Sequence, residues 1–288
     1  MSGVTWVNGR MVKNGECCLS IRERGFLYGD GLFETVRVYG GKPFAWERHM
    51  ARLSAGCERL GIPYPGRLIA DGTRDVLRAL GPADGSLRVT VTRGEAPRGL
   101  LAPPGTKPTV VITFSAGEPY SPEAYGRGFR AVTVSFPRNQ LSPLVRLKTL
   151  NYLENLLGKQ EAAAAGADEG IFLNLRGELA EGTISNIFLV LEDRQITTPP
   201  PESGLLPGIT REWVITLAGK LGYSVCERPV FPRDFLRARE AFLTNSLLEV
   251  MPLVALDGTP VGIGSPGPVA KALRDAYREI VVNGFDGH

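Results

Sequence analysis

The residue best suited to covalent chemistry is Lys148, in the stretch Leu147-Lys148-Thr149-Leu150. We expect a helix to begin at this lysine. Burial and the positive end of a helix dipole both lower the pKa of an ammonium group and favour the neutral amine. A neutral lysine amine can form a Schiff base with an aldehyde. Position alone also fits a surface lysine whose stem covers apolar neighbours, and that reading is the more common one.

A phosphate-sized anion site is predicted at the stretch Leu205–Arg211. The Pro207-Gly208 turn leads into a predicted helix, so the backbone N–H groups of Ile209 and Thr210 would be free at its first turn. The Thr210 hydroxyl could add a further donor. Simple N-capping by Thr210 explains the same pattern and is the more common case.

Three further polar residues could complete a cofactor site. Glu181 lies between apolar segments and could pair with a protonated pyridine nitrogen, although a solvent-exposed turn fits equally well. Ser246 follows a buried strand at a place that suits either a ligand or a turn. Arg52 lies on a predicted amphipathic helix, where it could bind a phosphate through two hydrogen bonds or lie at the rim of the helix.

The few histidines and the spacing of the cysteines limit which metal sites and hydrolase mechanisms the chain could have. The only histidines are His49 and His288, which excludes a histidine-rich metal site and leaves His49 alone for a serine or cysteine hydrolase. The four cysteines (Cys17, Cys18, Cys57 and Cys226) match no zinc pattern, and we expect reduced thiols and no metal. The chemistry is therefore expected from lysine, carboxylates, hydroxyls or a cofactor.

Composition describes an ordinary globular chain. It has 288 residues, is 43% hydrophobic and carries a formal net charge of +3. This charge is too small to indicate nucleic acid or an acidic membrane surface as a partner. The sequence shows no signal peptide and no apolar run of membrane-spanning length. We expect a cytoplasmic protein acting on small molecules.

The elements that must position these residues form an α+β pattern. Apolar residues at alternating steps of three and four predict a helix over 46–60, ended by Gly61. Strands are predicted on both sides of Asn8-Gly9, and the Gly29-Asp30-Gly31 turn is predicted to lead into another strand. The pattern breaks near Pro119, which predicts a small domain over 1–119 and a larger one over 120–288. Further helices are predicted over about 148–165, 210–221 and 268–281.

Taken together, the motifs resemble the class IV aminotransferases, the fold-type IV pyridoxal 5'-phosphate (PLP) enzymes. The resemblance is strongest at Lys148-Thr149-Leu150-Asn151-Tyr152, at Glu181-Gly182 with Ser185-Asn186, and at Leu206–Arg211. It implies two α+β domains with mainly antiparallel sheets, an active site between them, and a homodimer. By the same resemblance, Lys148 forms the Schiff base with PLP and moves protons, and Glu181 holds the pyridine nitrogen. Arg52, Ile209, Thr210 and Ser246 are then expected to bind the phosphate, and Tyr152 the phenolic oxygen of the cofactor.

The substrate is less closely indicated. Arg98, on a Gly/Pro-rich loop, is the natural candidate to bind an α-carboxylate. D-amino acid aminotransferases of this family add a histidine and a tyrosine where this chain has Leu100 and Phe33. Branched-chain enzymes usually have Gly-Thr-Ala where this chain has Asn245-Ser246-Leu247. We predict an aminotransferase for a small D- or branched-chain amino acid and a 2-oxo acid. The alternative is a 4-amino-4-deoxychorismate lyase that releases pyruvate and 4-aminobenzoate.

Overall fold

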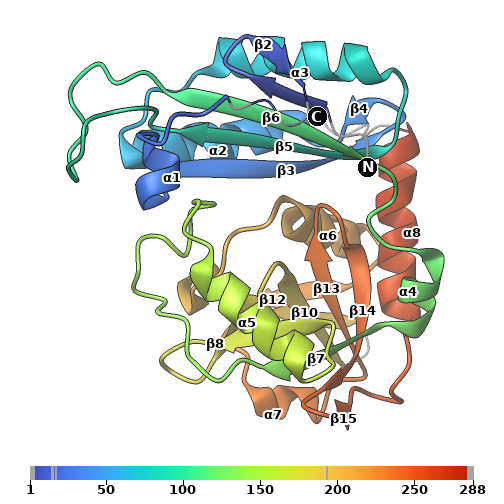
Figure 1. The fold of residues 1–288 in the computed structure, drawn as a ribbon. Helices are drawn as coiled ribbons and strands as arrows, with labels where there is room; N and C mark the ends of the chain where they lie inside the picture. The colour runs from blue at the N-terminus through green and yellow to red at the C-terminus, as the bar shows by residue number, and fades with distance from the viewer. Residues whose placement is uncertain (1–3, 14–15, 17, 193, 284–288) are drawn as a thin grey trace. The chain divides into compact units, whose positions relative to one another are not determined.

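The structure is a computed structural model that describes residues 4–13, 16, 18–192 and 194–283 (Figure 1). Cys17 and His288 lie outside the described residues. The chain divides into two compact units: unit 1 comprises Met1–Pro119 and Leu147–Tyr152, and unit 2 comprises Tyr120–Arg146 and Leu153–His288. The linear division into 1–119 and 120–288 stays a prediction. The two compact units differ from it at one segment, because Leu147–Tyr152 belongs to unit 1. Within the described ranges, no helix is both long and apolar enough to span a membrane.

Unit 1 is built on a six-stranded antiparallel sheet in the order β2-β1-β6-β5-β3-β4. The predicted turn at Asn8-Gly9 joins β1 to β2, and Asn8 and Gly9 both adopt positive φ angles. The strands are β1 Val4–Val7, β2 Arg10–Val12, β3 Gly31–Tyr39, β4 Lys42–Pro43, β5 Gly85–Thr92 and β6 Thr109–Ala116.

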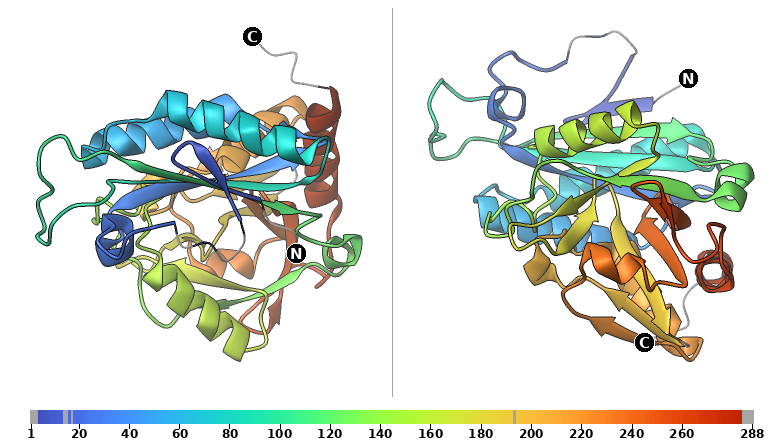
Figure 2. Two further views of the ribbon diagram at one scale, coloured as in Figure 1. Left: turned by 45° about the horizontal axis from the view of Figure 1, so that its top comes forward. Right: turned by 90° about the horizontal axis from the view of Figure 1, so that it is seen from below.

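Two long helices cover one face of this sheet, α2 (Trp46–Leu60) and α3 (Gly66–Leu80), as the left view of Figure 2 shows. A short helix, α1 (Arg24–Tyr28), precedes β3. The predicted helix over 46–60 is confirmed, and Gly61 ends it in the left-handed conformation with a φ of 63°. Alternate residues of β3, among them Leu32, Val36 and Val38, join the core under the helices. The intervening residues of β3 therefore face the other side of the sheet.

Unit 2 contains a nine-stranded mixed sheet in the order β12-β11-β10-β13-β14-β7-β8-β9, with β15 paired to β14. Three of its strand pairs are parallel and five are antiparallel. The predicted α+β class with mainly antiparallel sheets is confirmed. The strands are β7 Phe129–Thr133, β8 Glu169–Leu173, β9 Leu179–Gly182, β10 Asn186–Glu192, β11 Gln195–Thr198, β12 Ser224–Glu227, β13 Glu240–Asn245, β14 Glu249–Leu256 and β15 Thr259–Pro260.

The helices of unit 2 are α4 Pro122–Arg127, α5 Leu153–Ala164, α6 Ile209–Lys220, α7 Pro232–Phe235 and α8 Pro268–Asn283, with a 3-10 turn over Pro201–Ser203. The helices predicted over 210–221 and 268–281 correspond to α6 and α8. One face of the sheet packs into an apolar core that includes Ile171, Ile187 and Leu243.

The helix predicted to begin at Lys148 is wrong in its first turn, because α5 begins only at Leu153. The Lys148 segment instead lies alongside β3. The Phe33 N–H donates to the Lys148 carbonyl at 2.9 Å, and the Leu150 N–H donates to the Gly31 carbonyl at 3.0 Å. Thr149 forms an isolated bridge with Leu32. Pairing with a strand more than a hundred residues away in the sequence outweighs the local helical pattern.

Candidate active site

Lys148 lies in unit 1 against an aromatic pair. Its Nζ atom donates to the Tyr152 hydroxyl at 3.3 Å and lies 4.4 Å from the centre of the Phe33 ring. The Tyr152 ring meets the Phe33 ring edge-on, with 5.0 Å between their centres. Phe33 is on the face of β3 opposite the helices, and the backbone pairing described above fixes Lys148 beside it. The structure thus brings together Lys148, Tyr152 and Phe33. Lys148 is not at a helix N-terminus, because α5 begins only at Leu153, so a helix dipole does not activate its amine.

Arg52 belongs to a buried ionic cluster under the same strand. Its Nε atom donates to Glu34 Oε1 at 2.8 Å and its second terminal nitrogen donates to Oε2 at 2.7 Å. His49 Nδ1 lies 2.8 Å from the same Oε2 atom. Glu34 and His49 are fully buried, whereas the Arg52 side chain is 21% exposed. Arg52 is therefore held in one orientation by a fork of two hydrogen bonds, with part of its side chain exposed.

The electrostatics of this cluster are set by Arg52. Burial raises the pKa of Glu34, but the hydrogen bonds and charges of Arg52 and His49 overcome it and lower the pKa to about 2. Burial lowers the pKa of His49 in spite of the Glu34 carboxylate. Glu34 and His49 were missed as site residues, although a signal existed: strand alternation places Glu34 among the apolar residues that face α2, where a lone carboxylate needs a partner.

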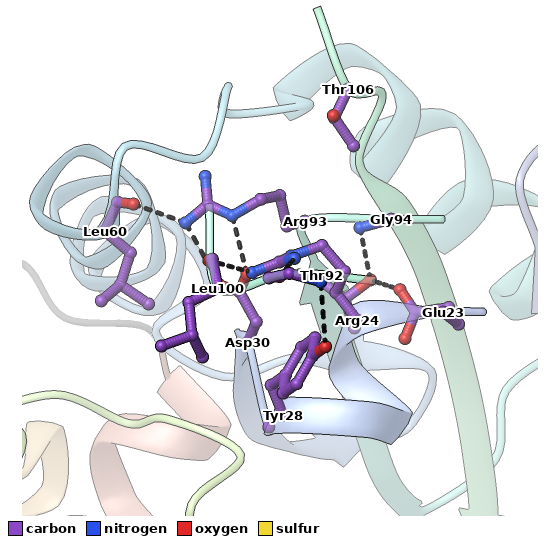
Figure 3. A network of polar contacts seen from close by, with 12 residues as sticks. Glu23, Arg24, Tyr28, Asp30, Leu60, Thr92, Arg93, Gly94, Leu100 and Thr106 are labelled. Atoms are coloured by element: carbon purple, nitrogen blue, oxygen red, sulfur yellow. Dashed lines mark hydrogen bonds and ion pairs between the residues drawn. The ribbon is translucent and has the colours of Figure 1, made fainter. Parts of the chain in front are cut away.

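Arg98 and Leu100 lie on an exposed loop after β5 that a polar network holds in place (Figure 3). Arg24 donates to the carbonyl oxygens of Gly99 and Leu100, both at 2.7 Å, and its Nε donates to Asp30. Arg93, from the end of β5, also donates to Asp30. Burial acts to raise the pKa of Asp30, but Arg93 and Arg24 lower it overall. The network fixes the backbone that carries Arg98, and the Leu100 side chain is 82% exposed.

The predicted anion site in unit 2 lies at the start of α6. Gly208 is its N-cap residue, with extended φ and ψ of −79° and 137°, and no side chain caps the helix. The capping role considered for Thr210 is wrong, because Thr210 is inside the helix and buried. With a glycine at the cap, the first backbone N–H groups, at Ile209 and Thr210, have no side-chain acceptor. A Cβ atom on Gly208 would lie 2.1 Å from Asn186 Oδ1, so any larger residue there would have to displace the Asn186 side chain, which donates to the Leu206 carbonyl.

Glu181 is a buried residue of β9, and the solvent-exposed turn considered for it is wrong. Its Oε1 atom accepts from Arg138 at 2.7 Å, and its Oε2 atom accepts from the Leu206 N–H at 3.0 Å. Arg138 is itself buried and stacks on the Phe172 ring at 4.3 Å. The guanidinium keeps Glu181 ionised, which suits a carboxylate that must face a protonated ring nitrogen. Arg138 was missed in the sequence, because nothing near it in the chain indicates its partner.

The turn between β13 and β14 carries Asn245, Ser246 and Leu247, all half-buried. Asn245 Oδ1 accepts from the N–H groups of Leu247 and Leu248 at 2.8 and 2.6 Å, and its Nδ2 donates to the Ile184 carbonyl at 2.9 Å. The Asn245 side chain therefore shapes the turn that presents Ser246. This structural role accounts for three of its hydrogen bonds.

The chain matches the family model for amino-transferase class IV over residues 31–256. The chain belongs to the class IV aminotransferase family. It is 36% identical over 280 residues to a putative branched-chain-amino-acid aminotransferase of Methanocaldococcus jannaschii, covering 96% of this chain and 95% of that one. Identity is 33% over 279 residues to the D-alanine aminotransferase of Bacillus licheniformis, covering 96% of each. It is 34% over 282 residues to the aminodeoxychorismate lyase of Bacillus subtilis, covering 96% of this chain and 94% of that one.

Solved structures of the family have the same fold. A branched-chain amino acid aminotransferase from T.th., solved with pyridoxamine 5'-phosphate, superposes with a TM-score of 0.90 at 31% identity, covering 99% of this chain and 96% of that one. The 4-amino-4-deoxychorismate lyase of Pseudomonas aeruginosa gives a TM-score of 0.83 at 34% identity, covering 96% and 98%. The chain is thus a fold-type IV enzyme of a PLP-dependent transaminase family.

The residues present in each unit fit such a cofactor chemically. Unit 1 offers a lysine amine beside a tyrosine hydroxyl, and an arginine fixed by a buried carboxylate. Unit 2 offers an ionised carboxylate held by Arg138, and a glycine-capped helix start that suits a phosphate. Among the described residues, no group of three or more histidine, cysteine or acidic side chains forms a possible metal site.

Proposed function

We propose that this class IV aminotransferase transfers an amino group between a small amino acid, of the D- or branched-chain type, and a 2-oxo acid. The observation that carries the proposal is the placement of Lys148. Its amine lies over the Phe33 ring and donates to Tyr152, on a segment that two backbone hydrogen bonds fix against β3. A lysine held this firmly is suited to one repeated covalent and proton-transfer task.

The roles of the cofactor-binding residues follow from their contacts. Lys148 would hold the PLP aldehyde carbon, and Tyr152 would donate to the phenolic oxygen of PLP. Glu181 would keep the pyridine nitrogen protonated, because Arg138 keeps Glu181 itself ionised. Arg52 would bind the phosphate, together with the N–H groups of Ile209 and Thr210 and the hydroxyl of Ser246.

The cofactor, when bound, supplies the electron sink that makes the α-hydrogen of an amino acid acidic. The Lys148 amine would take the proton from the substrate Cα atom and deliver it to the cofactor's carbon, which is the step that distinguishes transamination. Tyr152, through its hydrogen bond, orients the amine during this transfer.

The substrate is identified by half-reactions of the PLP-loaded enzyme with a panel of D- and L-amino acids. We expect conversion of the cofactor to its amine form by a small amino acid of one configuration, with release of the 2-oxo acid. A half-reaction with valine, leucine or isoleucine would indicate the branched-chain activity. A half-reaction with D-alanine or D-glutamate would indicate the D-type activity. Absence of a half-reaction with every amino acid in the panel would refute the transaminase proposal.

A second candidate is a 4-amino-4-deoxychorismate lyase, because identity to the Bacillus subtilis lyase is as high as that to the D-alanine aminotransferase. Both reactions need the α-proton removed by lysine and differ in the bond that breaks afterwards. Release of pyruvate and 4-aminobenzoate from aminodeoxychorismate, without an amino-acid half-reaction, would favour the lyase. We also propose a homodimer, which light scattering on the purified protein tests directly.

A further inference from the structure

The turn that carries Ser246 has an unusual residue at its base. Asn245 and Glu249 form the last pair of strands β13 and β14, and Ser246 lies between them in the chain. Glu249 has a φ of 53°, in the left-handed region that a residue of this size rarely adopts. The left-handed backbone brings the Cβ atom close to a carbonyl oxygen, so other contacts must hold Glu249 in this conformation.

The side chain of Glu249 is buried and paired with two arginines of α8. Arg278 Nε donates to Glu249 Oε2 at 2.8 Å, and Arg274 Nε donates to the same atom at 3.4 Å. The Arg274 guanidinium also stacks on the Tyr125 ring, with its carbon 3.2 Å from the ring centre. A buried carboxylate with charge-assisted hydrogen bonds to two arginines cannot turn away without losing them. These contacts therefore hold Glu249 in its left-handed conformation.

The other end of α8 is tied to the other end of the same hairpin. Glu240, at the start of β13, accepts from the N–H groups of Val269 and Ala270 in the first turn of α8, all at 3.1 Å. The helix rises about 14 Å from Val269 to Arg278, and β13 extends about 17 Å from Glu240 to Asn245. Helix α8 therefore runs along the hairpin from its open end to its turn, beside β14 (Figure 1).

We propose that Glu249 is a positioning residue for the PLP phosphate: held by Arg274 and Arg278, it fixes the turn that presents Ser246. This inference rests on the phosphate role of Ser246 in the proposed function. Glu249 acts through the backbone of the turn and not by contact, because an acidic side chain repels a phosphate. Loss of the contacts with α8 should then weaken the hold on the phosphate and leave the binding of the pyridine ring unchanged.

The test compares affinities for PLP and for pyridoxal, which lacks the phosphate, by equilibrium dialysis. Glu249→Ala removes the ion pairs but keeps a Cβ atom, so affinity for PLP should fall about tenfold while that for pyridoxal stays the same. Glu249→Gly should come within about threefold of the wild type, because glycine adopts a positive φ without strain. Arg278→Met, which keeps the Arg274 contact, should lower PLP affinity about threefold. Lys271→Met, at an exposed position of the same helix, is the control.

Phosphorus NMR of the PLP-saturated proteins gives a second readout. The phosphate signal of Glu249→Ala should move toward that of free PLP, whereas the signal of Lys271→Met should match the wild type. The inference is overturned if Glu249→Ala binds PLP as the wild type does, or if Glu249→Gly binds it as weakly as Glu249→Ala. Equal losses of affinity for PLP and pyridoxal would also overturn it, because they identify a purely structural role.

Ser246→Ala separates this inference from the proposed phosphate site. Weaker PLP binding in Ser246→Ala, with wild-type binding in Glu249→Ala, would refute the inference and leave the phosphate role of Ser246 intact. Unchanged PLP binding in Ser246→Ala would refute the phosphate role of Ser246, and the inference with it. Because these binding measurements need no turnover, failure of the transaminase proposal would leave their results interpretable.

Discussion

The buried pair of Glu34 and Arg52 makes the stability of this protein depend on pH. Glu34 titrates near 4.5 in an unfolded chain and at about 2 in the folded protein. Because the folded pKa is the lower one, the stabilisation is complete above pH 4.5 and is lost as the pH falls toward 2. The total is about 3 kcal/mol, of which about 1.4 kcal/mol is already lost at pH 3.5.

The perturbation is Glu34→Gln, which removes this titration. We expect the variant to be less stable at pH 7 by about 3 kcal/mol, since it leaves Arg52 without its buried counter-charge. Between pH 6 and pH 3.5 the difference from the parent protein should shrink by about 1.4 kcal/mol. The parent protein and the Glu34→Gln variant should both carry His49→Asn, because the imidazole would otherwise titrate in the same experiment. The asparagine amide can replace the Nδ1 donor of His49.

The assay is urea unfolding of the full-length proteins at a series of pH values. Glu47→Gln is the matched control, because Glu47 is an exposed glutamate on the same helix as Arg52. A stability difference between the Glu34→Gln protein and its parent that stays constant from pH 6 to pH 3.5 would refute the low folded pKa. A difference that grows on acidification would show that the sign is wrong.

Two further perturbations address the phosphate site. Arg52→Ala should lower PLP affinity, measured by equilibrium dialysis, and unchanged PLP affinity would show that Arg52 does not bind the phosphate. The same variant should lower the free energy of unfolding by about 3 kcal/mol, because it leaves the buried Glu34 with His49 as its only partner in this cluster. Gly208→Ala should lower PLP affinity at least tenfold, because the new Cβ atom would lie 2.1 Å from Asn186 Oδ1 and would disturb the hydrogen bond from Asn186 to the Leu206 carbonyl beside the helix start. Gly219→Ala, on the same helix, is the control, because a Cβ atom there meets nothing within 4 Å. Equal affinity for PLP in the two variants would show that the start of α6 does not bind the phosphate.

Local patterns predicted the parts of the fold that local interactions determine. The apolar spacing over 46–60 and the turn at Asn8-Gly9 predict α2 and the first hairpin, and both are confirmed. The helix expected at Lys148 was wrong, because backbone pairing with Gly31 and Phe33 keeps that segment extended. That pairing joins residues more than a hundred positions apart, and no periodicity in one segment can indicate it.

The same limit applies to the site. Lys148, Glu181 and the start of α6 were indicated by residue type and by the family resemblance. Arg138 was missed because its partner, Glu181, is 43 positions away. Glu34 was missed because its buried partners lie on α2, and only the packing of β3 against α2 brings them together. A local pattern such as strand alternation can mark a residue like Glu34 as buried, but it does not identify the partner that a tertiary contact supplies.

We propose that Lys148 carries the cofactor, and borohydride reduction followed by peptide mapping is a direct test of this role. The PLP-loaded protein is reduced and digested, and the modified peptide is identified by mass spectrometry. We predict a phosphopyridoxyl group on the peptide containing Lys148, and its absence in Lys148→Ala. Stoichiometric label on another lysine, such as Lys159, or a wild-type protein that takes up no label after incubation with PLP, would show that Lys148 does not carry the cofactor.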